Sequence, residues 1–169
     1  MDKAIHKEYI VNLIDSMLHN MDEQSSNVML IEHYNTLDLT DNDVMEMSRG
    51  KEDVKFLYHS YETGDIVAAF EPFLDWIKEL FYELADESLD DFFENAGVYL
   101  LHRSIFKSYF ETGVCVRTED VLINEIEFEE EKLYKEIGKM LEYLSEKKTL
   151  MFVLNKIHYA GNSTINLLR

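Results

Sequence analysis

The apolar and polar positions of the chain alternate mostly with the period of amphipathic helices. In residues 2–21, apolar side chains recur every three or four positions, which places them on one face of a helix. Residues 65–85 show the pattern more strongly. Their apolar stripe consists of Phe70, Phe73, Leu74, Ile77, Leu80, Phe81 and Leu84. The same spacing predicts further helices at residues 40–50, 51–63, 88–112, 118–147 and 149–159.

A repeated phrase suggests where some of these helices end. Tyr-Glu-Thr-Gly closes at Gly64, Tyr-Phe-Glu-Thr-Gly closes at Gly113, and a weaker version closes at Gly161. Glycine is favoured just past a helix end because it adopts the left-handed conformation without a steric penalty. The intervals of 49 and 48 residues resemble those of helical-hairpin repeats. Because the apolar patterns do not recur with the glycines, coincident capping in an irregular bundle is the better explanation.

Composition agrees with a helical domain. The chain has 169 residues, of which 46% are hydrophobic, so it can bury a core as one domain, residues 1–169. The chain has a single proline, whereas sheets usually need more turn residues. We therefore predict an all-α fold, an irregular bundle of about six to eight helices; helical-hairpin repeats are the alternative architecture.

Several classes of protein are disfavoured. The first residues carry charges where a signal peptide would be apolar, and no apolar run approaches the roughly 18 residues of a membrane span. The lone Cys115 has no partner in the chain for a disulfide. These features predict a cytoplasmic protein that does not bind membranes.

The charge of the chain is strongly negative and unevenly distributed. The formal net charge is −18, and residues 65–113 contain 11 acidic against 3 basic side chains. Such a charge repels nucleic acid directly and attracts basic proteins. We therefore expect a basic protein partner, including one whose usual ligand is DNA or RNA.

The acidic side chains of residues 71–94 predict the binding surface. Four of them, at positions 71, 75, 79 and 83, step by four, so on a helix they lie opposite the apolar stripe. Like charges at this spacing cost about 0.2–0.5 kcal/mol each, and Lys78 is the one base within the segment. We call the predicted residues the acidic surface: Glu71, Asp75, Glu79, Tyr82, Glu83, Asp86, Glu87, Asp90, Asp91 and Glu94. A solvated face that serves only solubility is the alternative.

No motif predicts catalysis, a metal or a cofactor. No two of the six histidines are three or four residues apart, and no Cys-x-x-Cys accompanies them. The carboxylates of Asp86, Asp90 and Glu94 lack a turn that would wrap a cation. Cys115 lies between two valines, which predicts a buried, unreactive thiol. We predict a protein that is not an enzyme.

Residues 56–77, "FLYHSYETGDIVAAFEPFLDWI", resemble part of the PoNi immunity proteins, which neutralise polymorphic-toxin DNases of the PoNe type. The residues that carry the resemblance are Tyr58, Ser60, Tyr61, Gly64 and Phe70. The resemblance covers about a seventh of the chain, and the last residues lack the aromatic clustering of that family. It implies an all-α bacterial protein that occludes a cognate toxin.

Together these observations predict an inhibitor, an immunity protein that covers a basic nuclease toxin. The same acidic surface would serve a nucleic-acid mimic directed against a restriction or CRISPR effector. A structural or adaptor subunit is a third possibility, favoured if a homo-oligomer buries the apolar stripe of residues 70–84.

Overall fold

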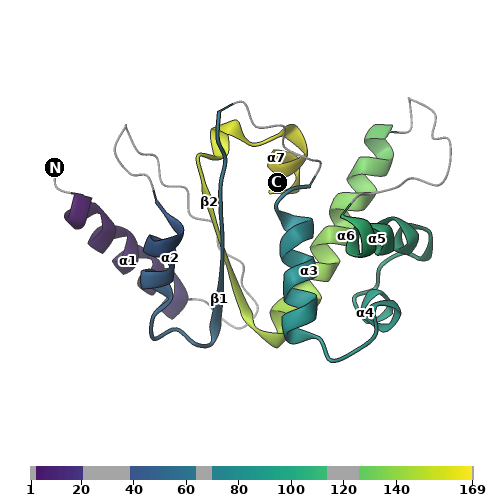
Figure 1. The fold of residues 1–169 in the computed structure, drawn as a ribbon, viewed down its shortest axis with the longest axis horizontal. Helices are drawn as coiled ribbons and strands as arrows, with labels where there is room; N and C mark the ends of the chain where they lie inside the picture. Colours follow the sequence, from purple (N-terminus) through teal and green to yellow (C-terminus); the bar gives the residue numbers. More distant parts are fainter. Residues whose placement is uncertain (1–2, 21–38, 64–69, 114–125, 169) are drawn as a thin grey trace. The chain divides into compact units, whose positions relative to one another are not determined.

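The computed structural model describes residues 3–20, 39–63, 70–113 and 126–168 (Figure 1). The chain divides into two compact units, residues 1–49 and residues 50–169. No helix in the described ranges combines the length and the apolarity needed to cross a membrane.

In the unit of residues 1–49, the described residues form two helices, α1 (Lys3–Asn20) and α2 (Asp41–Ser48). The helix predicted at residues 2–21 is thus confirmed. A reciprocal cap starts α2: the Thr40 hydroxyl accepts the Asp43 N–H at 3.3 Å, and the Asp43 carboxylate accepts the Thr40 N–H at 2.9 Å. This cap satisfies backbone donors at the helix start that have no partner within the helix.

The unit of residues 50–169 contains a two-stranded parallel sheet, which the sequence analysis did not predict. Strand β1 (Val54–Ser60) pairs with β2 (Thr149–Asn155), with Val54 opposite Thr149 and Ser60 opposite Asn155. The helices predicted at residues 51–63 and 149–159 are therefore wrong, and the fold is mostly helical rather than all-α. Both segments are rich in β-branched and aromatic residues, which suit the pleated surface of a sheet.

The described part of the connection between the two strands contains four helices. They are α3 (Phe73–Leu84), α4 (Leu89–Asn95), α5 (Leu100–Thr112) and α6 (Ile126–Lys147). After β2 come a short 3₁₀ turn, η2 (Ile157–Tyr159), and α7 (Asn162–Leu167). A long crossover of this kind is required because parallel strands cannot be joined by a tight hairpin.

Two glycines mark the ends of helical segments, and a third does not. Gly113 ends α5 in the left-handed conformation, φ 75°, as predicted. Gly97, at φ 72°, divides the single helix predicted at residues 88–112 into α4 and α5. Gly161 precedes α7 with φ −67° and so begins a helix instead of ending one. Gly64 lies outside the described residues, so the structure supports the predicted stop at one of the three glycines.

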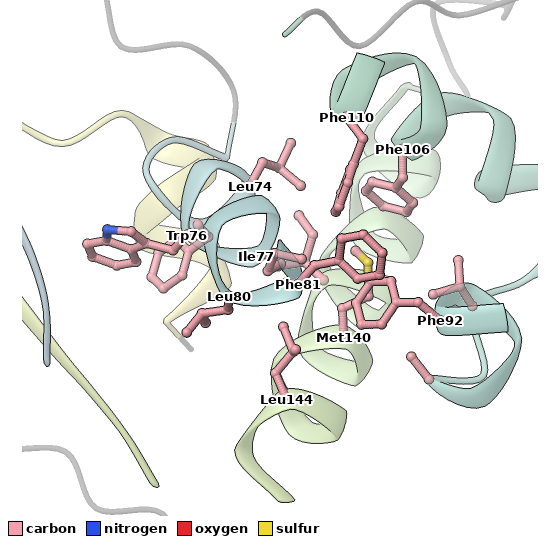
Figure 2. Packing of buried hydrophobic residues seen from close by; sticks show 14 of the residues in the cluster. Leu74, Trp76, Ile77, Leu80, Phe81, Phe92, Phe106, Phe110, Met140 and Leu144 are labelled. Carbon is pink, nitrogen blue, oxygen red and sulfur yellow. The ribbon is translucent and has the colours of Figure 1, made fainter. Parts of the chain in front are cut away.

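The core of this unit lies between α3 and its neighbours (Figure 2). Leu74, Ile77, Leu80 and Phe81 of α3 are all buried. Figure 2 shows them with aromatic residues of α4 and α5 and with aliphatic residues of α6, namely Phe92, Phe106, Phe110, Met140 and Leu144. Full burial of each such side chain contributes roughly 1.5–3 kcal/mol. The apolar stripe that a homo-oligomer would have to cover is therefore largely buried in the chain's own core.

The sheet packs against the other side of α3. Trp76 stacks on Phe152 of β2, with ring centroids 5.4 Å apart, and Leu57 of β1 is buried in the same core. Side chains alternate between the two faces of a strand, so Lys55 shares the face of Leu57 and also points toward α3. The fold thereby places a lysine of β1 beside the acidic helix.

Candidate protein-binding surface

Helix α3 carries the centre of the predicted acidic surface. Asp75, Glu79 and Tyr82 are exposed, and the buried stripe of α3 occupies the other face, as predicted from the spacing. Glu71 precedes the helix, which begins at Phe73, so the predicted row of four carboxylates does not lie wholly on one helix. The helix predicted from residue 65 begins eight residues later, and residues 64–69 lie outside the described residues.

A lysine from β1 neutralises part of this row. The Lys55 ammonium lies 3.1 Å from a Glu79 carboxylate oxygen and also donates a hydrogen bond to Glu83. Burial acts to lower the pKa of Lys55, but its hydrogen bonds to Glu83 and Glu79 outweigh that effect and raise the pKa above its ordinary value. Two of the four regularly spaced acids are thus compensated by a base from another element.

Two bases of α5 face the carboxylates of α4. Lys107 lies 3.1 Å from Asp90, and Arg103 lies 3.6 Å from Glu94. Ser88 caps α4, since its hydroxyl accepts the Asp91 N–H at 3.2 Å and donates to the Asp91 carboxylate at 2.7 Å. In the sequence, a serine with an acidic residue three positions later favours such a cap at the start of a helix.

The Glu87 carboxylate is held by contacts within the fold. Its carboxylate accepts hydrogen bonds from Asn95 at 2.6 Å and from the Tyr143 hydroxyl at 2.8 Å, and it lies 3.5 Å from the Lys147 ammonium. Burial would raise the pKa of Glu87, but these partners together lower it. Because Glu87 bridges α4 and α6, we assign it to the fold rather than to the surface that meets a partner.

Asp75 and Asp86 are more available to a partner. Asp75 accepts a hydrogen bond from the Tyr109 hydroxyl at 2.6 Å, and Asp86 is exposed. Within the described part of the chain, neither has a lysine or arginine within ion-pair distance. Tyr82 lies between them in the sequence with 67% of its surface exposed.

The structure therefore lowers, without removing, the negative charge predicted for this surface. The surface contains nine carboxylates and Lys78, and four bases from other elements form ion pairs with it. Counted over the described residues alone, nine acids against five bases leave four negative charges in excess. The four additional bases are Lys55, Arg103, Lys107 and Lys147.

The sequence pattern did not reveal those four bases because they lie outside residues 71–94. A signal existed for Lys55: it lies within "VKFLYHS", where aromatic and β-branched residues favour a strand. No local pattern indicated that Arg103 or Lys107 would pack beside α4. The exposed apolar residues Tyr99, Leu100 and Leu101 at the start of α5 were also not predicted.

A buried polar cluster lies beneath that exposed apolar group. The Glu136 carboxylate accepts the Tyr99 N–H at 2.9 Å, interacts with Lys139 at 3.1 Å, and lies 3.8 Å from Nδ1 of His102. His102 and Glu136 are both buried at the junction of α5 and α6. Among the described residues, no group of three His, Cys, Asp or Glu side chains is arranged to hold a metal ion. Cys115 lies outside the described residues.

The chain was compared with protein-family models, with curated proteins and with solved structures, and none of the three comparisons gave a match.

Proposed function

We propose that the protein is a binding protein that docks its acidic surface onto a basic protein. The negative excess over α3 and α4, together with a net charge of −18, would attract such a partner at long range. In this proposal Asp75 and Asp86 meet the partner's lysines and arginines, whereas Glu79, Glu83 and Glu87 hold the fold together.

The observation that carries the proposal is the position of Tyr82. A tyrosine with 67% of its surface exposed projects from the same helix as exposed carboxylates. Its ring rests at 5.1 Å from Phe81 and 6.5 Å from Phe110, so the aromatic core supports it from below. Tyrosines held in this way are common anchors of protein interfaces, because they bury a large area at a small cost in side-chain entropy.

More narrowly, we propose that the partner is a nuclease toxin and that the protein is its immunity protein. A nucleic-acid mimic would instead need regularly spaced free charges, since double-stranded DNA carries about one charge per 1.7 Å of helix axis. Among the described residues, at least five of the nine carboxylates are paired with lysine or arginine, which interrupts any regular row. This pairing favours the immunity protein over the mimic.

The test begins with capture of partners from a lysate of the native host at low and high salt, followed by kinetics with the captured protein. The surface variant combines Asp75→Asn and Asp86→Asn. The matched control combines Glu142→Gln and Glu146→Gln, which removes the same charge from exposed positions of α6. A third variant is Tyr82→Ala.

We expect the surface variant to slow association about three- to tenfold at low salt and to flatten its salt dependence, because steering depends on local charge. Tyr82→Ala should chiefly speed dissociation. Equal slowing by the surface and control variants would mean that net charge alone acts, and would refute the proposed surface. If the captured protein degrades DNA equally well with and without a saturating amount of this protein, the role in immunity is refuted.

A further inference from the structure

A short helix covers the turn that precedes the acidic helix. The hydroxyl of Thr164 in α7 donates a hydrogen bond to the Glu71 carbonyl at 2.7 Å, and the Ser163 hydroxyl accepts the Phe70 N–H at 3.3 Å. Glu71 and Phe70 lie directly before α3, so these two bonds connect residues 93 positions apart in the chain. Figure 1 shows α7 next to the start of α3.

The contacts of α7 are few. The helix has six residues, and Thr164 is the one residue of α7 that is fully buried. Helices of this length are unstable without tertiary contacts. Its attachment therefore depends on two polar contacts and on partly buried side chains such as Leu167.

A hydroxyl group without a well-formed hydrogen bond lies beside Thr164. Tyr61 has no exposed surface, and among the described residues its hydroxyl has no partner in good geometry. The Thr164 hydroxyl is close enough to lower the pKa of Tyr61 by hydrogen bonding, but it donates its own proton to the Glu71 carbonyl, and the bond between the two hydroxyls is poorly formed. Burial raises the pKa of the Tyr61 phenol, and Thr164 offsets this rise only in part.

A buried hydroxyl whose hydrogen bond is poorly formed disfavours the closed arrangement, because water would satisfy the hydroxyl fully if α7 moved away. Phe70 adds to this effect. It is buried with φ 66°, a left-handed conformation that is unfavourable for a bulky side chain, and its N–H is one of the two groups that contact α7. Two unfavourable features thus lie next to this short helix.

We propose that α7 is a latch on the turn before α3, and that it opens by local unfolding while the rest of residues 50–169 stays folded. Thr164 holds the latch closed, and Tyr61 favours its opening. Opening frees the Glu71 carbonyl and the Phe70 N–H, and so it loosens the chain immediately before the first turn of α3. This device is independent of any partner and does not rest on the proposed function.

Hydrogen exchange of single amides tests the latch on the full chain. The Ile165 N–H, which donates to the Gly161 carbonyl at 3.2 Å, reports on α7, and the Leu80 amide within α3 reports on global unfolding. We expect Ile165 to exchange more than about tenfold faster than Leu80 after correction for intrinsic rates. Equal protection of the two amides would overturn the proposal.

Three variants then separate the latch from global stability. Thr164→Val removes one hydrogen bond and should speed Ile165 exchange about three- to tenfold, whereas Tyr61→Phe removes the poorly bonded hydroxyl and should slow it by a similar factor. The control Ile137→Val weakens the buried core of α6, so it should speed Leu80 exchange and leave Ile165 unchanged. If Ile137→Val speeds both amides equally, α7 opens only when the whole unit unfolds. If Tyr61→Phe speeds Ile165 exchange, the hydroxyl does not favour opening.

Discussion

At the scale of single residues, Lys55 reduces the repulsion between two carboxylates of the acidic helix α3. The side chain of Lys55 is 22% exposed, and it contacts two carboxylates that would otherwise repel each other at the i,i+4 spacing. An ion pair at the surface contributes little, and breaking a fully buried one is costly. Lys55 is partly buried, so its ion pairs lie between these two cases. Its position explains how Glu79 and Glu83 can lie one helical turn apart without strong repulsion.

We predict that Lys55→Met lowers the free energy of unfolding by roughly 1–2 kcal/mol, because it leaves two partly shielded carboxylates without a counter-charge. The measurement is urea denaturation near neutral pH. Lys78→Met is the matched control: Lys78 lies on the same helix as the two acids and has no ion-pair partner among the described residues, so it should change stability by less than about 0.5 kcal/mol. Equal effects of the two substitutions would show that the geometry of Lys55 contributes nothing specific.

At the scale of secondary-structure elements, periodicity predicted several of the helices but not the strands. The spacing of apolar residues indicated α1 and α3, and the Ser88 cap indicated the start of α4. The segments that form β1 and β2 contain short apolar runs that fit either a helix or a strand. Pairing across nearly ninety residues of chain settles their structure, and no local window contains that information.

Replacing Gly97 and Gly138 by alanine should change the stability of the protein in opposite directions. Gly97 separates α4 from α5 at φ 72°, and a Cβ there would meet no atom within 4 Å, so Gly97→Ala should destabilise through backbone conformation alone, by about 1 kcal/mol. Gly138 lies inside α6 with equally open surroundings, so Gly138→Ala should stabilise by about 0.5–1 kcal/mol. Urea midpoints of the two variants measure both effects, and a stabilising Gly97→Ala would contradict the role of Gly97 as the break between helices.

At the scale of the whole molecule, composition predicted the sign of the charge correctly and its local distribution less well. The excess over residues 71–94 was visible in the sequence, but Arg103, Lys107 and Lys147 reach it only through the packing of α5 and α6. The charge counted over a short stretch of sequence therefore exceeds the net charge of the folded surface whenever oppositely charged residues from distant segments fold against it.

The net charge of −18 also predicts how stability depends on salt. Self-repulsion opposes the compact state, and raising NaCl from about 10 to 200 mM shortens the screening length from roughly 30 Å to below 10 Å. The same salt weakens exposed ion pairs, but each contributes only about 0.2–1 kcal/mol. We therefore expect the thermal midpoint to rise with NaCl by about 3–6 °C. The variant Glu142→Gln with Glu146→Gln, which has two fewer negative charges, should show a smaller rise. A midpoint that falls with salt would mean that the ion pairs of Lys55, Arg103 and Lys107 stabilise the fold more than the remaining charge destabilises it.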